Sequence, residues 1–208
     1  MTVKFMKPFA LSGLLVSLQL SAVKLRRDTR GLAAVEFAII VPLMLGMFFA
    51  TVELSSGVAV DRKVSMTAEG LADLVSRYTN VNDSDFTNFF TIGRAMVTPY
   101  AAAPLKATIT EVFIDSTTGV GRAQWSKGDY PRAVGSTVPV PANLISRDAS
   151  NNIIPGQYLI FSEISYVYTP AVGYIVKSAV TLSDTTYMRP RLSQCVLYPQ
   201  VGGACPTS

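Results

Sequence analysis

Histidine is absent from this chain of 208 residues. Its absence excludes Ser-His-Asp and Cys-His catalysis, together with the usual zinc sites and the facial iron sites. Carboxylates and hydroxyls are present, but no spaced acid–base pair or nucleophile motif stands out among them. We therefore expect no catalytic residue, no metal site and no cofactor, and we predict that the chain is not an enzyme. A membrane-tethered envelope enzyme or sensor remains as an alternative hypothesis.

Charged residues are also scarce, at 15% of the chain against 49% hydrophobic residues. The formal net charge is +4, yet the basic residues are scattered except for a cluster formed by Lys24, Arg26, Arg27 and Arg30. Because there is neither a basic stripe nor an aromatic platform, we expect no nucleic-acid partner. The cluster directly precedes a long apolar run, and short basic flanks stay on the cytoplasmic side of a membrane. The pattern therefore predicts a cytoplasmic N-terminus.

The apolar run has no charged residue from 37 to 52. As a helix, this stretch would be about 24 Å long, slightly shorter than a hydrocarbon core of about 30 Å. Extending the helix over 32–60 gives about 43 Å, which is enough to cross with tilt if Glu36 and Glu53 lie near the two membrane edges. We predict one transmembrane helix over 32–60, and we interpret Glu53 as an interfacial residue that contacts a partner.

The first 31 residues combine the basic cluster with a moderately apolar stretch at 8–23. A secretory signal peptide is one interpretation, but cleavage after Ala22 would put the large Leu20 where a small residue is needed. An amphipathic segment lying on the membrane and a long cytoplasmic leader are the other two interpretations. All three stay open, and we define 1–31 as a cytoplasmic leader that is either cleaved or retained.

Beyond the span, apolar residues keep helical spacing while the other positions become polar. We predict a periplasmic helical extension and a second short helix over 61–98, with Asp83 or Ser84 as its cap and Pro99 as its end. The residues expected on the buried face of the extension are Val60, Val64, Leu71, Leu74, Val75 and Tyr78.

From residue 99 the hydrophobic period changes to that of strands. The segments 107–115 and 120–126 predict a hairpin, and 157–170 and 178–190 predict two more strands, separated by a long polar loop at 128–156. We therefore predict an α+β fold, in which a long N-terminal membrane-spanning helix continues into a periplasmic domain with an antiparallel, pilin-like sheet over 99–208. The strand order is not readable.

Cysteine occurs only twice, as Cys195 and Cys205, ten positions apart in a C-terminal loop. A disulfide there would contribute about 2–3 kcal/mol and would persist only in an oxidising compartment. The alternative is two unpaired thiols in a flexible tail. We favour the disulfide, because the predicted topology independently puts this end outside the cytoplasm.

Arg189 and Arg191 flank Pro190 near the end of the last predicted strand. They could hold an anionic group, although a contact with the sheet is the simpler interpretation. Glu163 is predicted to pair with one of them.

The string from Gly31 to Phe37 resembles the processing motif of type IV prepilins, a glycine after basic residues followed by an apolar helix with a glutamate at its fifth position. The fuller string RGLAAVEFAIIVPLML is similar to the TadE/TadG-like family of minor pseudopilins from tight-adherence (Flp) pilus systems. The resemblance extends over most of 26–191, through ADLVSRY at 72–78, Trp125, and the strings FSEISYVYTP and TYMRPR.

This resemblance implies a non-enzymatic component of pilus assembly, anchored in the bacterial inner membrane by a single span. A prepilin peptidase would cut between Gly31 and Leu32. The amine of Leu32 would then pair with Glu36 of its own chain or of an adjacent chain and register neighbouring helices. The other implied partners are pilins or pseudopilins, the inner-membrane assembly platform and membrane lipid. An unprocessed bitopic scaffold of the same machinery is the alternative, because Leu32 replaces the phenylalanine of many pilins and the leader is long.

Overall fold

The computed structural model describes residues 31–170, 178–199 and 203–205, and the chain divides into two compact units, Met1–Phe49 and Ala50–Ser208. The leader up to residue 30 lies outside the described residues. So do its basic cluster and its apolar stretch, and the three interpretations of that segment stay open.

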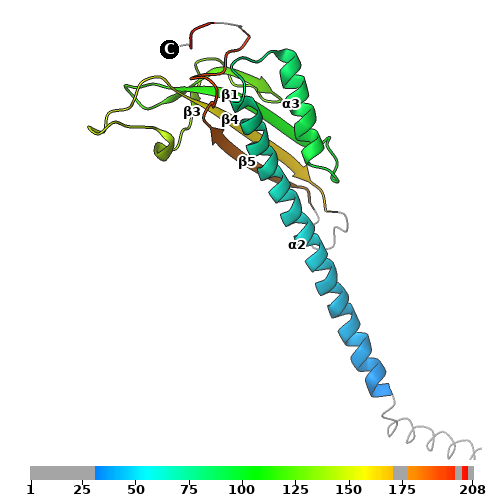
Figure 1. Cartoon of the computed structure of the whole chain (residues 1–208). Helices are drawn as coiled ribbons and strands as arrows, with labels where there is room; N and C mark the ends of the chain where they lie inside the picture. The colour runs from blue at the N-terminus through cyan, green and yellow to red at the C-terminus, as the bar shows by residue number, and fades with distance from the viewer. Residues whose placement is uncertain (1–30, 171–177, 200–202, 206–208) are drawn as a thin grey trace, which may run out of the picture. The chain divides into compact units, whose positions relative to one another are not determined.

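Helix α2 runs without interruption from Leu32 to Ser76 (Figure 1). Its 45 residues include Pro42 in the apolar part, where the ring removes one backbone donor. The predicted span at 32–60 and the predicted extension beyond it are therefore one helix. At 1.5 Å per residue, the 45 residues are about 68 Å long, roughly twice the thickness of a hydrocarbon core.

Five antiparallel strands form one sheet in the order β3-β2-β1-β4-β5. The α+β fold with a long apolar helix and an antiparallel sheet is thus confirmed. The predicted hairpin is β1 with β2, and the region predicted as a loop also contains the short edge strand β3 and a 3₁₀ turn, η2. The bounds are β1 Leu105–Ile114, β2 Gly121–Gly128, β3 Thr137–Val138, η2 Ala142–Leu144, β4 Gln157–Tyr168 and β5 Val180–Met188.

Helix α3, Asp83–Met96, follows a short turn after α2. Its cap is Asn82, whose side chain accepts hydrogen bonds from the backbone N–H groups of Ser84 and Asp85, while Asp85 accepts from the N–H of Asn82. The prediction of Asp83 or Ser84 as the cap was therefore wrong by one or two residues. Asparagine, aspartate and serine all suit this position, and the surrounding geometry decides which of them serves.

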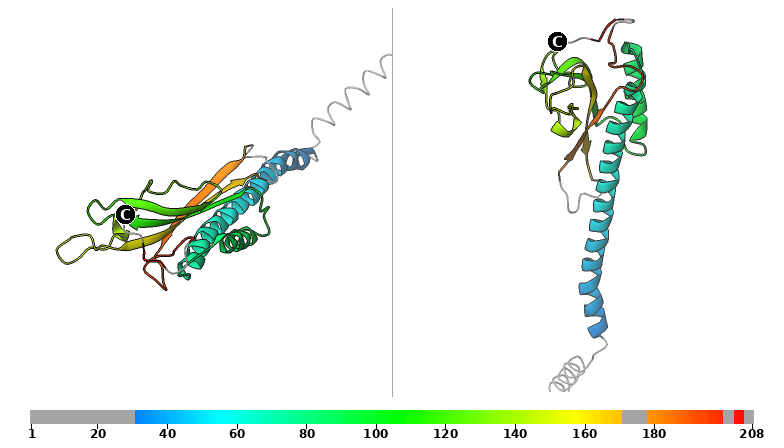
Figure 2. Two further views of the ribbon diagram at one scale, coloured as in Figure 1. Left: turned by 90° about the horizontal axis from the view of Figure 1, so that it is seen from above. Right: turned by 60° about the vertical axis from the view of Figure 1, so that its left-hand side comes forward.

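The main core lies between one face of the sheet and the two helices, α3 and the second half of α2 (Figure 2). Of the helix face predicted to be buried, Val60, Val64, Leu71 and Val75 are fully buried. Tyr78 is 38% exposed and packs edge-on against Phe89 of α3.

A smaller apolar cluster covers part of the opposite face of the sheet. Val112, Leu159 and Phe161 supply its sheet side, and the segment between β2 and β4 folds over them. Tyr187 of β5 stacks on Phe161 and donates a hydrogen bond to the carbonyl of Pro139, which fastens the segment to the sheet. Beside the cluster, the same face carries the polar side chains of Thr108, Glu163 and Thr185.

Candidate functional site

The predicted processing segment is the start of α2. Gly31 is exposed and directly precedes the helix, whose first residue is Leu32. Glu36 is exposed and lies four positions further, one turn along the same face of the helix. Within residues 31–170, 178–199 and 203–205, Glu36 has no ion pair and no hydrogen-bonded side-chain partner. Its carboxylate is therefore free to meet a cation that this part of the chain does not supply.

The first half of α2 exposes large apolar side chains around its whole circumference. Phe37 and Ile39 are each 69% exposed, and Leu43 and Met47 are similar. Among the described helices, α2 is the one that is long and apolar enough to cross a membrane. Apolar exposure on this scale is stable in lipid and costly in water, which is consistent with a single-pass membrane protein.

Glu53 lies at the far end of the apolar stretch and is only 6% exposed. It borders an apolar groove of about 470 Å³ whose other walls include Leu54 and Gly57 of α2, and Tyr168 and Leu182 of the strands. The side chain predicted to face a partner thus lies against the chain itself.

The two cysteines are joined by a disulfide, with their Cα atoms 5.8 Å apart. Two side chains of the sheet form hydrogen bonds with the segment beside this disulfide. The indole of Trp125 donates a hydrogen bond of 2.7 Å to the carbonyl of Val196, and the N–H of Val196 donates one of 2.5 Å to a carboxyl oxygen of Glu111. Both backbone groups of Val196, its carbonyl and its N–H, are therefore bonded to side chains of the sheet, which fixes the C-terminal segment at this residue.

Sequence reasoning missed Glu111, which is 1% exposed in the middle of β1. Burial raises the pKa of its carboxyl to about 8, while the hydrogen bonds from Val196 and Trp125 act in the opposite direction. The signal was a single acid in the apolar strand LKATITEVFI. Its orientation toward Val196 depends on a contact between positions 85 residues apart, which the pattern does not contain.

The arginines near residue 190 do not meet Glu163, so that prediction was wrong. Arg189 donates to the carbonyl of Leu144, and Arg191 forms an ion pair of 2.5 Å with Asp73 of α2. Both make structural contacts, as the simpler interpretation expected. Glu163 instead accepts two hydrogen bonds from the guanidinium of Arg132, at 2.6 and 2.9 Å.

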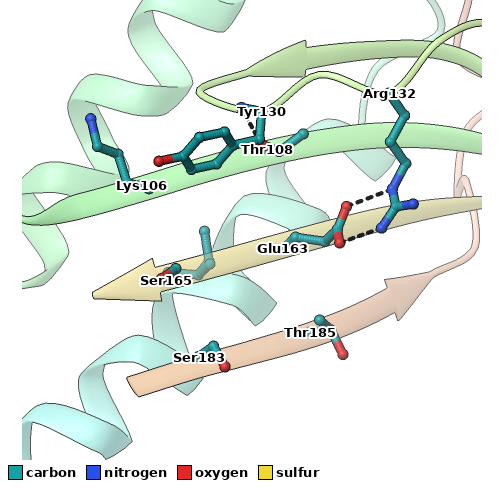
Figure 3. Close-up of a pocket in the computed structure, with 9 residues that line it drawn as sticks. Lys106, Thr108, Tyr130, Arg132, Glu163, Ser165, Ser183 and Thr185 are labelled. Atoms are coloured by element: carbon teal, nitrogen blue, oxygen red, sulfur yellow. Dashed lines mark hydrogen bonds and ion pairs between the residues drawn. The ribbon is translucent and has the colours of Figure 1, made fainter. Parts of the chain in front are cut away.

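That pair lies in a polar hollow of about 460 Å³ on the face of the sheet away from the helices (Figure 3). Three strands form its floor, and the segment after β2 forms one wall. Its lining residues are Lys106, Thr108, Tyr130, Arg132, Glu163, Ile164, Ser165, Ser183 and Thr185.

Residues 31–70 match the TadE-like protein family. The predicted resemblance is confirmed over this segment, which contains Gly31, Leu32, Glu36 and most of α2. The TadE-like match ends at Gly70, so the resemblance proposed for 72–78, Trp125 and the later strands stays a prediction. No curated protein and no solved structure matches the chain.

Proposed function

We propose that this chain is a non-enzymatic, membrane-anchored pseudopilin of Tad pilus assembly. The observation that carries the proposal is the segment Gly31–Glu36. A glycine precedes an apolar helix with an exposed carboxylate one turn inside it, within the part of the chain that matches the TadE-like family. The TadE-like family suggests a component of the Tad pilus assembly system, and the role as a pseudopilin rests on this motif.

In the proposed mechanism a prepilin peptidase cuts between Gly31 and Leu32. The new amine of Leu32 carries a positive charge near Glu36, and pairing offsets the cost of a carboxylate near the hydrocarbon region. Pairing with Glu36 of a neighbouring pilin-like helix would fix the relative height of the two helices. The apolar surface of residues 37–52 then packs against lipid and other pilin-like helices of the assembly platform.

The proposed orientation puts the N-terminus in the cytoplasm and the sheet domain in the periplasm of a bacterial inner membrane. The disulfide between Cys195 and Cys205 supports it, since such bonds persist in an oxidising compartment. The positively charged residues before Gly31 support the same orientation from the other end of the helix.

The replacement Glu36→Gln tests the mechanism because it removes the charge and keeps the shape. Pilus assembly is expected to be lost while the protein still fractionates with the membrane. Glu69→Gln serves as the matched control, because Glu69 is an exposed acid on the same helix outside the apolar half. Normal assembly with Glu36→Gln would contradict the register mechanism and favour the bitopic scaffold.

A further inference from the structure

The polar hollow takes no part in the function proposed above. Its floor is built from two rows of side chains that cross β1, β4 and β5 in register. One row is Thr108, Glu163 and Thr185, and the next is Lys106, Ser165 and Ser183. The apolar cluster on the same face stops at Phe161 and Tyr187, and no residue of that cluster covers this polar half.

Its charges are already compensated within the chain. Lys106 forms an ion pair of 3.1 Å with Asp129, and Arg132 binds Glu163 through two parallel hydrogen bonds. An anionic or cationic ligand would have to displace one of these partners. A neutral ligand would keep both pairs, and could also accept from Arg132 or donate to Glu163 at their free positions.

Hydroxyl groups dominate the rest of the floor. Ser165, Ser183 and Thr185 have no side-chain hydrogen bond to any residue within 31–170, 178–199 and 203–205. Each hydroxyl can donate one hydrogen bond and accept others, which matches a ligand that carries hydroxyls of its own.

An aromatic ring completes the site. Tyr130 is 70% exposed, and its backbone N–H donates a hydrogen bond of 3.1 Å to Thr108 Oγ1, which fixes the residue at the wall. Figure 3 shows the ring of Tyr130 lying over β1 on the side toward Lys106. A ring that is held by its backbone yet open to solvent offers an apolar surface beside a polar floor.

From this arrangement we infer that the polar hollow binds a neutral saccharide of one or two hexose units. The aliphatic C–H face of a sugar ring stacks on Tyr130, and its hydroxyls bond to the floor hydroxyls and to the Arg132–Glu163 pair. The volume of about 460 Å³ lies in the range of roughly 300–1,000 Å³ that is usual for small-ligand sites. This inference is independent of the pseudopilin proposal, and neither depends on the other.

The test uses the full chain in a detergent without a sugar head group. Saturation-transfer NMR is recorded with glucose, galactose, N-acetylglucosamine and the disaccharides of each, and with glucuronate and inorganic phosphate as charged probes. At least one neutral sugar is expected to bind, with contacts on its C–H face. Tyr130→Ala, at an exposed position that leaves the sheet intact, is expected to weaken binding at least about tenfold.

Ser183→Trp fills the polar hollow and is expected to abolish the signal. Thr181→Trp is its matched control, because Thr181 is also exposed on β5 and faces the same side but does not line the site. Three results would overturn the inference. They are no binding by any neutral sugar in the panel, equal binding by the Ser183→Trp variant, and preferential binding of glucuronate or phosphate.

Discussion

The two halves of α2 carry similar apolar residues but place them in opposite surroundings. From residue 37 to 52 the helix is apolar on all sides, and side chains such as Leu43 are exposed. From Val60 to Ser76 most apolar residues occupy one face and are buried in the core with the sheet and α3, while Met66 is exposed. One continuous helix thus changes its environment along its length.

The two segments differ in both the number and the distribution of their apolar residues, since 13 of the 16 positions at 37–52 are hydrophobic against 8 of the 17 at 60–76. Charged residues such as Asp61 and Glu69 lie on the exposed side of the second half, whereas residues 37–52 include no charged residue. The family match covers the whole first half and reaches into the second, ending at Gly70. The matched segment therefore includes both the exposed apolar stretch and the first buried residues of the second half, such as Val60, Val64 and Ala68.

The largest expected effect comes from truncating one leucine in each half. Leu71→Ala removes a fully buried side chain and is expected to lower the free energy of unfolding by about 2–5 kcal/mol. Leu43→Ala, its exposed counterpart, should change the stability of the sheet domain by less than about 0.5 kcal/mol. Denaturant unfolding followed by the fluorescence of the single tryptophan, Trp125, measures both. Equal losses of unfolding free energy for Leu71→Ala and Leu43→Ala would contradict the distinction between a buried and an exposed half of α2.

A second test contrasts the buried carboxyl of β1 with an exposed one on α2. The pKa of Glu111 is about 8 in the fold against 4.5 ordinarily, so the unfolded chain releases this proton first as pH rises. The contribution of Glu111 to stability is therefore fully present below about pH 4.5, and roughly 2–4 kcal/mol of it should be lost between pH 5 and pH 8. Glu111→Gln is expected to flatten this pH dependence, because an amide does not titrate. The amide oxygen can still accept the hydrogen bond from the N–H of Val196, so the fold should be kept.

Glu69→Gln is the control for this experiment, because Glu69 is exposed and should leave the pH profile unchanged. Chemical unfolding of each variant at several pH values gives the comparison. A wild-type stability that rises from pH 5 to pH 8 would contradict the burial of a neutral Glu111.

The disulfide provides a test that affects the sheet domain alone. Replacing Cys195 and Cys205 together by serine should lower the free energy of unfolding by about 2–3 kcal/mol. Membrane insertion should be unaffected, because both cysteines lie outside the apolar stretch at 37–52. Thermal unfolding and membrane fractionation of the same variant separate the two effects, and loss of insertion would contradict this division of roles.

The smallest expected effect concerns the turn between the two helices. Asn82→Ala removes the cap of α3 and should cost about 1 kcal/mol. Thr91→Ala, at an exposed position within α3, is a matched control with an expected change below about 0.5 kcal/mol. Both are measured by thermal unfolding, and equal destabilisation would mean that Asn82 does not act as a cap.

The elements themselves could be predicted from the sequence because each has a local signal. The apolar run, the helical spacing from Val60 to Val75 and the β-branched segments gave α2 and four of the five strands. The short strand β3 was missed because its two residues pair with β2 at a sheet edge and have no period of their own.

Contacts between distant segments were the part that could not be predicted. Glu163 has Arg132 as its partner, at a separation of 31 residues, and this pairing depends on how the segment after β2 folds back. The polar hollow could not be predicted for the same reason, since its residues come from three strands and one loop. The processing segment could be proposed from the sequence because its residues, Gly31 to Glu36, are contiguous, and it stays a prediction.

The identity of the mature N-terminus tests the central claim most directly. Intact mass spectrometry of the protein purified from membranes of cells with active prepilin peptidase should give a chain beginning at Leu32. The Gly31→Ala variant should retain the leader. A wild-type chain that still begins at Met1 in such cells would contradict the proposal of a processed pseudopilin.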